Sequence, residues 1–150
     1  MDALRLDSQL CFALYAAARA MSQAYAKLLT PLGLTYPQYL VMLVLWEEDG
    51  LAVRQLGERL ELDSGTLTPL LKRLESAGLV RRERDRTDER VVRIHLSPAG
   101  RGLKQRARGV PRAVACSAGL SVPELARLRS ELRHLTHTLR SAEPTQEKRP

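Results

Sequence analysis

The stretch Leu60-Glu-Leu-Asp-Ser-Gly-Thr-Leu-Thr-Pro-Leu-Leu-Lys-Arg-Leu-Glu75 decides the fold of this chain. Leucines recur in it at spacings of three and four residues, which is the pattern of a helix with one apolar face. They are Leu67, Leu70, Leu71 and Leu74. Asp63 or Ser64 can cap the start of this helix, and Gly78 follows its end. The segment therefore predicts a capped helix that packs its leucines inward.

The other face of the same helix is polar and basic. It carries short hydroxyl side chains and two cations, namely Ser64, Thr66, Thr68, Lys72 and Arg73. Pro69 lies among them, and a proline there removes one backbone hydrogen bond and is expected to bend the first turns. One α-helix fits the major groove of DNA, where base edges are read by side chains of these types. A helix N-terminus also favours phosphate. This face, Pro69 included, is therefore predicted to contact DNA.

Two short basic strands are predicted after Gly78, at residues 80–84 and 90–96, with residues 85–89 as the loop between them. Arg86 stands at the loop tip, where it can enter the minor groove, and Arg90 is expected to contact DNA as well. Asp88 is predicted to orient Arg90 through an ion pair. A reading helix followed by a β-wing defines a mainly α winged helix-turn-helix fold with a small sheet.

The rest of the chain is predicted to form helices around this unit. Apolar spacing predicts a helix over residues 5–31, a buried helix opening at the capping box Thr35 to Gln38, and a short helix over 53–60. We expect one domain over 1–150. Its DNA-binding part covers about 35–96, its dimerisation helices about 4–31 and 98–140, and a disordered tail 142–150.

The last predicted helix begins at the capping box Ser121 to Glu124. Its leucines alternate spacings of three and four, which suits the seam of paired helices. They are Leu125, Leu128, Leu132, Leu135 and Leu139. Pairing between two subunits is one interpretation of this seam, and packing of the helix on its own domain is the other.

The charge balance favours a polyanionic partner. Lys and Arg number 24 against 17 Asp and Glu, for a net charge of +7. Nucleic acid is the first candidate for such a partner and an acidic membrane surface the second. Residues 101–112 hold five basic side chains and no acid, so this stretch is expected to neutralise phosphates. It lacks the aromatic-rich amphipathic face that membrane binding would need.

Other features argue against export, membranes and metals. The N-terminus lacks the order of a signal peptide, and the longest apolar run, residues 39–46, is too short to span a bilayer. A cytoplasmic location without membrane contact is therefore expected. There is no Cys-x-x-Cys pair and no Cys/His cluster with zinc spacing, and His134 and His137 have no nearby carboxylate or thiol partner. Neither a metal nor a cofactor is expected.

The cysteines, Cys11 and Cys116, are isolated in the sequence. A free cysteine is either a small buried hydrophobe or a reactive thiol. A reactive thiol needs hydrogen-bond donors, and Tyr15, Tyr25 and Tyr36 are the nearest hydroxyls. Tyr25 lies about 21 Å from Cys11 along a straight helix. If Tyr25 contacts a Cys11, that cysteine therefore belongs to a partner subunit, and the same can hold for Tyr36.

Several strings of this chain resemble one known family. They are Leu6-Asp-Ser-Gln-Leu-Cys-Phe-Ala-Leu-Tyr15, Gly33-Leu-Thr-Tyr-Pro-Gln-Tyr39, Leu45-Trp-Glu-Glu-Asp-Gly50, Leu62-Asp-Ser-Gly-Thr-Leu-Thr-Pro-Leu-Leu-Lys-Arg-Leu74 and Asp88-Glu-Arg90. Over residues 4–140 the chain resembles the organic hydroperoxide resistance regulators (OhrR), a thiol-sensing branch of the MarR winged-helix family. The first and fourth strings are specific to that branch, whereas Asp-x-Arg is common to MarR proteins.

The resemblance implies a homodimeric repressor of a peroxide-detoxification gene, not an enzyme. Cys11 matches the peroxide-reactive cysteine of the family, and Tyr25 and Tyr36 match the tyrosines that hydrogen-bond it across the dimer. Cys116 resembles the resolving cysteine of the two-cysteine subgroup. Organic hydroperoxide is then the inducer: it oxidises Cys11, an intersubunit disulfide to Cys116 follows, and DNA is released. A dimer also implies a pseudo-palindromic operator in double-stranded DNA.

Two other functions fit parts of the sequence. The first is a MarR-type repressor with inert cysteines that is released by a phenolic or carboxylate ligand; in that case a Cys11→Ser variant would keep its induction. The second is a thiol peroxidase, which multiple-turnover peroxide loss would reveal. No arginine stands beside Cys11 in the sequence to support peroxidase chemistry.

Overall fold

The structure is a computed structural model that describes residues 4–142. In chain order the elements are η1 (Leu6–Ser8), α1 (Leu10–Leu29), η2 (Thr30–Leu32), α2 (Tyr36–Glu47), β1 (Leu51–Ala52), α3 (Val53–Leu60), α4 (Ser64–Ser76), β2 (Val80–Arg84), β3 (Val92–Leu96), α5 (Pro98–Ala107), α6 (Val110–Ala118) and α7 (Val122–Ser141). The chain divides into two compact units at residue 111, and each is described by itself. The mainly helical winged-helix fold predicted from sequence is confirmed. The predicted tail, 142–150, falls outside the described residues from 143 on.

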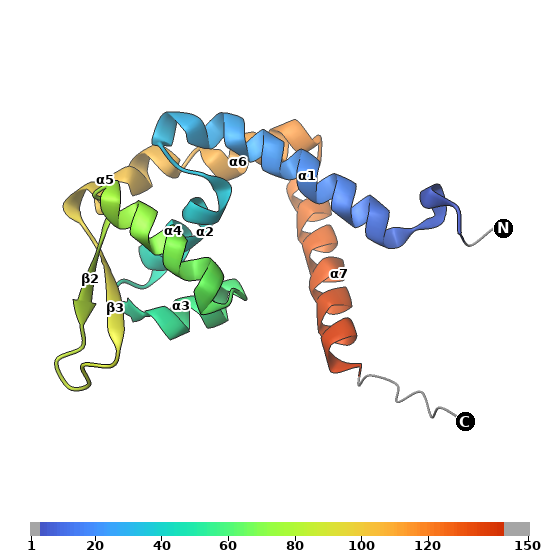
Figure 1. The fold of residues 1–150 in the computed structure, drawn as a ribbon. Helices are drawn as coiled ribbons and strands as arrows, with labels where there is room; N and C mark the ends of the chain where they lie inside the picture. The colour runs from blue at the N-terminus through green and yellow to red at the C-terminus, as the bar shows by residue number, and fades with distance from the viewer. Residues whose placement is uncertain (1–3, 143–150) are drawn as a thin grey trace, which may run out of the picture. The chain divides into compact units, whose positions relative to one another are not determined.

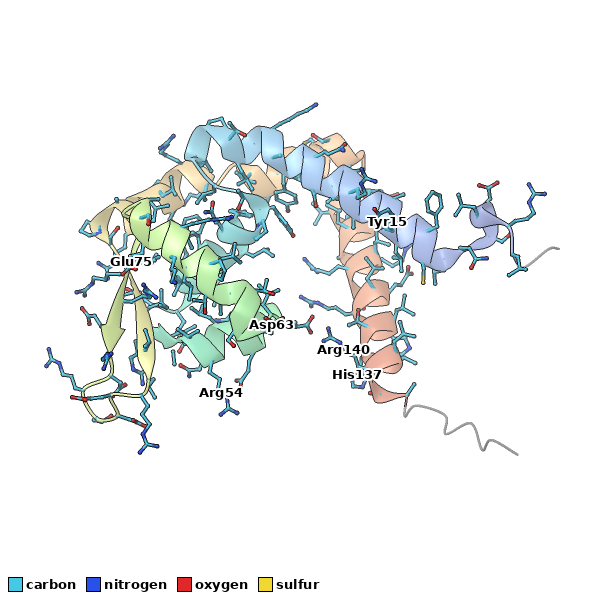
Figure 2. The ribbon with its side chains drawn as sticks, in the orientation of Figure 1. Tyr15, Arg54, Asp63, Glu75, His137 and Arg140 are labelled. Carbon is cyan, nitrogen blue, oxygen red and sulfur yellow. The ribbon has the colours of Figure 1, made fainter. Side chains whose placement is uncertain are left out.

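Helix α4 forms as its sequence pattern predicts. The Asp63 carboxylate caps it by accepting the backbone N–H of Thr66 at 2.8 Å. Leu67, Leu71 and Leu74 are at most 1% exposed, so the apolar face lies in the core. The helix continues through Pro69 to Ser76. Figure 2 shows Asp63 and Glu75 at its opposite ends.

Helix α2 is the centre of the first unit. The predicted capping box is present, because the Gln38 side chain accepts the Thr35 N–H and the Thr35 hydroxyl accepts the Gln38 N–H. The helix carries apolar residues on all its sides, and most of its residues from Tyr39 to Leu45 are buried. It contacts α1, α3, α4, α5 and β3. A helix that is apolar on all sides is stable only in such a position.

The wing belongs to a three-stranded antiparallel sheet with the order β1-β3-β2. Val80 pairs with Leu96 and Arg84 with Val92, so β2 and β3 form a hairpin that projects beyond the helices of the first unit (Figure 1). Strand β3 begins at Val92, two residues later than predicted, because the loop before it is held by its own hydrogen bonds. Strand β1 was not predicted, since two residues carry no periodic pattern.

The long first helix predicted over 5–31 is divided into η1, α1 and η2. Only Leu29 of α1 is buried, while apolar side chains such as Leu10, Phe12 and Tyr15 are 61%, 40% and 59% exposed. Exposed apolar side chains of this kind need a partner surface. No single helix of the described residues is long and apolar enough to cross a membrane; the bent pair 10–32 and 36–47 meets that test only when taken together.

The basic stretch after Ser97 is not one helix, as predicted, but two. Helix α5 ends at Ala107 and α6 begins at Val110, with Gly109 between them. In the second unit α7 starts at the predicted capping box of Ser121 and Glu124 and has no buried residue. Leu128, Leu132 and Leu139 of the predicted seam are 43%, 38% and 66% exposed.

Candidate DNA-binding surface and thiol site

The polar face of α4 is open to solvent at nearly every predicted position. Its exposed members are Ser64, Thr66, Pro69, Lys72 and Arg73, and Thr68 is half-buried. The Thr66 hydroxyl also donates to the Asp63 carboxylate at 3.2 Å, so it belongs to the helix cap as well as to this face. The core leucines on one side thus leave the polar residues on the other side free to meet a ligand.

Asp85 organises the loop of the wing. Its Oδ1 accepts the Thr87 N–H at 2.8 Å and the Thr87 hydroxyl at 2.6 Å, and its Oδ2 pairs with the Arg93 guanidinium. These hydrogen bonds, that from the Thr87 hydroxyl first, hold the pKa of the Asp85 carboxyl well below its usual range. Arg93 also donates to the carbonyl of Gly50 at 3.1 Å. The loop is therefore fixed to the body of the first unit.

The predicted ion pair between Asp88 and Arg90 is wrong. The Asp88 carboxylate instead accepts a hydrogen bond from the backbone N–H of Arg90 at 3.1 Å, which shapes the turn. The guanidinium of Arg90 takes no part in this bond. Within the loop, it is the Asp85 carboxylate that pairs with an arginine, Arg93, a role that sequence reasoning gave to Asp88. Both acids stand in the same loop, so only the path of the backbone distinguishes them.

The cations predicted to contact DNA differ from the arginines near them in whether they form ion pairs. Within residues 4–142, the side chains of Lys72, Arg73, Arg86 and Arg90 make no ion pair. Nearby arginines do: Arg82 pairs with Glu75 at 2.8 Å, and Arg81 pairs with Glu83. Arg84, at the end of β2, is exposed and also without an ion pair in that range, and sequence reasoning missed it although it precedes the loop directly.

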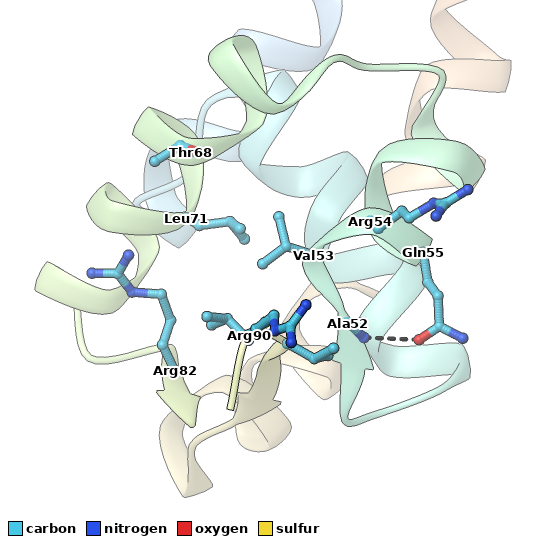
Figure 3. Close-up of a pocket in the computed structure, with 10 residues that line it drawn as sticks. Ala52, Val53, Arg54, Gln55, Thr68, Leu71, Arg82 and Arg90 are labelled. Carbon is cyan, nitrogen blue, oxygen red and sulfur yellow. Dashed lines mark hydrogen bonds between the residues drawn. The ribbon is translucent and has the colours of Figure 1, made fainter. Parts of the chain in front are cut away.

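A pocket of about 520 Å³ separates α4 from the wing (Figure 3). Thr68 and Leu71 of α4 line one side, and Arg82 and Arg90 line the wing side. Arg54 of α3 lines it as well, with its guanidinium bonded to Glu58. Side chains of α3, α4 and the wing therefore face one pocket, with Arg54, Arg82 and Arg90 among them.

The basic side chains of α5 have internal partners. Arg101 pairs with Asp49 at 2.7 Å, Lys104 donates to the carbonyl of Trp46 at 2.8 Å, and Arg106 donates to the carbonyl of Pro31 at 2.8 Å. We expected residues 101–112 to neutralise phosphates, and these contacts within the chain were not predicted. Much of the charge of this stretch holds helices together.

Both cysteines are free and exposed. Cys11 lies in the first turn of α1 and Cys116 in α6, and neither is buried within its own chain. Helix α1 runs unbroken from Cys11 past Tyr25, which keeps the two residues about 21 Å apart along its axis. Within one chain, Tyr25 therefore does not reach Cys11.

Tyr25 and Tyr36 lie together at the meeting of α1 and α2. Their ring centroids are 4.7 Å apart, and Tyr39 lies 5.8 Å from Tyr25. Burial raises the pKa of Tyr36 above its ordinary value of 10.0. Burial and the nearby Tyr36 raise the pKa of Tyr25 in the same direction. Both phenols thus remain protonated at neutral pH and can donate hydrogen bonds.

No group of three metal-ligating side chains gathers anywhere in residues 4–142. The described residues offer two exposed thiols, the phenols of Tyr25 and Tyr36, and basic side chains on α4 and in the wing. Together with the fold, these features define a winged-helix transcriptional regulator with accessible thiols.

Similarity to known proteins supports assignment to that class. A family model described as transcriptional regulator SarA/Rot matches residues 23–107. The chain is 57% identical to the HTH-type transcriptional regulator TtmR of Methylorubrum extorquens, over 87% of this chain and 71% of that protein. It is 47% identical to the organic hydroperoxide resistance transcriptional regulator of Bacillus subtilis, over 92% and 94%. The chain belongs to the MarR-type winged-helix regulators, in the branch of the organic hydroperoxide resistance regulators, which confirms the resemblance.

Solved structures of AbfR from Staphylococcus epidermidis are also similar. Reduced AbfR bound to DNA matches with a TM-score of 0.74 and 39% identity, over 95% of this chain and 100% of that one. Disulfide-formed AbfR matches with a TM-score of 0.61 and 40% identity, over 91% of each chain. The relatives are named as transcriptional regulators, which confirms the prediction of a regulator and not an enzyme.

Proposed function

We propose that this chain is a homodimeric repressor that binds a pseudo-palindromic operator and releases it when an organic hydroperoxide oxidises Cys11. The observation that carries the proposal is the placement of Cys11. It is an exposed, free thiol on an unbroken helix whose own Tyr25 is out of its reach. The hydroxyls of Tyr25 and Tyr36 can serve such a thiol only from a partner subunit, so a sensor of this kind is complete only in the dimer.

DNA binding rests on the exposed polar and basic side chains of α4 and the wing described above. The exposed polar residues of α4 would lie in the major groove, with Arg86 at the minor groove and Lys72, Arg73 and Arg90 on phosphates or bases. These three cations and Arg86 make no ion pair within residues 4–142, whereas Arg81 and Arg82 are paired with Glu83 and Glu75, so the former are available to pair with phosphate. In a dimer two such helices would stand about 34–36 Å apart, one turn of DNA. AbfR, a relative with solved DNA-bound structures, supports this proposal.

The chemistry of release balances without a cofactor. The Cys11 thiolate attacks the hydroperoxide, the O–O bond breaks, and the leaving alkoxide takes up the proton that the thiol had released, which gives an alcohol and a sulfenic acid. The thiol of Cys116 in the other subunit then displaces water from that sulfenic acid to form a disulfide. A disulfide requires Cα atoms within about 7 Å, so any longer separation in the reduced dimer forces helices to move. The disulfide-formed structure of AbfR supports such a state.

The test compares wild type, Cys11→Ser and Cys116→Ser on an operator duplex selected from random DNA by the reduced protein. Each is assayed before and after treatment with cumene hydroperoxide, with covalent dimer followed on non-reducing gels. Wild type should release DNA and form a covalent dimer that dithiothreitol reverses. Cys11→Ser should do neither, and Cys116→Ser should form no covalent dimer.

Release of Cys11→Ser by the peroxide would contradict the proposal. Release of wild type by a phenolic carboxylate, but not by the peroxide, would favour the ligand-controlled repressor. Catalytic loss of peroxide over many turnovers would favour the peroxidase. Each alternative thus has a distinct outcome in the same set of samples.

A further inference from the structure

The carboxylate of Asp49 joins three elements that are far apart in the sequence. Asp49 follows α2, and its Oδ1 accepts the backbone N–H of Leu96, the last residue of β3, at 2.7 Å. The same oxygen accepts the N–H of Gly50 at 2.9 Å. Its Oδ2 accepts a hydrogen bond from the Arg101 guanidinium of α5 at 2.7 Å. One side chain therefore links the end of α2, the base of the wing and α5.

The bond to Leu96 completes the edge of the sheet. Strand β1 pairs only with Ile94 and Arg93, and the N–H of Gly50 bonds to the Ile94 carbonyl at 3.0 Å. The next donor along that edge of β3 is the Leu96 N–H, which has no residue of β1 opposite it. The Asp49 carboxylate takes the place of the missing carbonyl. A left-handed turn at Gly50 (φ +78°) makes this possible, and a Cβ there would lie 3.0 Å from the His95 ring.

Further bonds hold the end of α2 to the start of α5. The indole N–H of Trp46 donates to the Gly100 carbonyl at 2.9 Å, and Lys104 donates to the Trp46 carbonyl. The Asp49 side chain is 30% exposed. Although partial burial opposes its ionisation, the bonds from Leu96, Arg101 and Gly50 hold the pKa of the Asp49 carboxyl below its ordinary value of 3.8. Asp49 is therefore charged at neutral pH.

The opposite end of α2 carries Tyr36, against the ring of Tyr25. A helix of this length spans about 18 Å. Six of its residues between Gln38 and Leu45 are buried, and a closely packed interior transmits displacement because it does not deform easily. A shift at Tyr36 therefore reaches the turn at Asp49, where the hydrogen bonds to Leu96 and Arg101 connect it to the wing and α5.

We propose that Asp49 is a positioning residue that couples the movement of α2 to the wing, so that oxidation at the thiol site displaces β2 and β3 from DNA. The inference rests on the proposed function, in which Tyr36 contacts the partner's Cys11. Asp49 itself touches neither the peroxide nor DNA. Its coupling role is therefore measured by the ratio of operator affinity between reduced and oxidised protein.

The experiment measures operator Kd, reduced and oxidised, for the full-length wild type and for Asp49→Ala, Asp49→Asn and Arg101→Gln. Glu131→Gln, which removes a charge from an ion pair on α7, is the matched control. The probe is the selected operator duplex, and the oxidant is cumene hydroperoxide. Mass spectrometry follows oxidation of Cys11 in each sample. Allosteric couplings commonly change affinity 5–150-fold, so we expect a ratio of about 100 in wild type and the control, and below about 10 in Asp49→Ala.

The milder variants keep the inference testable if Asp49→Ala does not fold. Asp49→Asn retains an oxygen for the N–H groups of Leu96 and Gly50, and Arg101→Gln leaves Asp49 intact. Both should give intermediate ratios with Cys11 fully oxidised. An unchanged ratio in every folded variant, even with weaker binding in both states, means a merely structural role and overturns the inference. A wild type that stays bound with Cys11 oxidised overturns the proposed function itself.

Discussion

The ring of Tyr36 lies 4.7 Å from the ring of Tyr25, with an angle of 43° between their planes. This contact joins the helix that carries Cys11 to the helix that ends at the base of the wing. Burial raises the pKa of both phenols, so each is a neutral hydrogen-bond donor across the physiological range. A donor of this kind stabilises a thiolate. It also stabilises the negative charge that develops on the leaving oxygen of the hydroperoxide.

Replacing either phenol should slow the oxidation of Cys11. Tyr25→Phe and Tyr36→Phe each remove one hydroxyl while keeping the ring, and loss of a hydrogen bond to a charged group commonly amounts to about 1.5 kcal/mol, or roughly a tenfold lower rate. The rate is measured as loss of free thiol after mixing with cumene hydroperoxide. Tyr15→Phe is compared with them, because Tyr15 is 59% exposed and stands one turn from Cys11 in the same chain, so a slower rate in this variant alone would indicate a donor within the chain. Equal rates in all variants would rule out this role.

Lys72 should contribute one phosphate contact. Lys72→Ala is expected to lower the slope of log Kd against log salt concentration by about 0.9, and to weaken binding similarly across operator sequences. Fluorescence anisotropy at several salt concentrations measures both quantities. Lys27→Ala, which removes the same charge from the end of α1, serves as the control. If both variants keep the wild-type slope, Lys72 does not contact phosphate.

The seam on α7 should support a dimer. Leu132→Asp places a charge at a 38% exposed position of the apolar row, and burying an unpaired carboxylate in an interface is strongly unfavourable. Sedimentation velocity should show mostly monomer at concentrations where wild type is dimeric. Ser130→Asp adds the same charge on the polar side of α7 and should remain dimeric. A dimeric Leu132→Asp would instead favour packing of the helix on its own domain.

Stability should depend on acid pH through Asp49. Its pKa in the folded chain lies below the ordinary value of 3.8, so its contribution is fully present above that pH and is lost as pH falls toward the folded pKa. Asp49→Asn lacks the titrating group. The difference in thermal unfolding midpoint between wild type and Asp49→Asn should therefore be largest near neutral pH and shrink below pH 3.8. A difference that stays constant with pH would show that the charge is not what stabilises the contact.

Much of the fold was predictable because its signals are local. The leucine spacing of α4, the capping boxes at Thr35 and Ser121, and the alternation of β3 all depend on residues within one or two turns. The break between α5 and α6 was missed, since Gly109 is a weak signal in a strongly basic run. Strand β1 was missed because its two residues become a strand only when β3 is beside them.

The candidate site was likewise predictable only in part. Sequence alone indicated which side chains on α4 and in the wing are polar and basic. It did not show that Asp85 organises the loop, because the carboxylates of Asp85 and Asp88 are chemically alike and only the folded backbone directs one toward Arg93. Nor did charge counting separate arginines that hold the fold, such as Arg101, from those that make no ion pair in residues 4–142, such as Arg86.

The amino-acid sequence by itself therefore determined the helices, the wing, the family and the thiols, because these follow from short-range periodicity, capping and local motifs. Tertiary structure alone decided which cations make ion pairs within the chain, that the rings of Tyr25 and Tyr36 are in contact, and that Asp49 joins α2 to the wing. The physical reason is that hydrogen bonds and ion pairs depend on distances of a few ångströms between residues tens of positions apart in the chain. Those distances exist only once the core around α2 has formed.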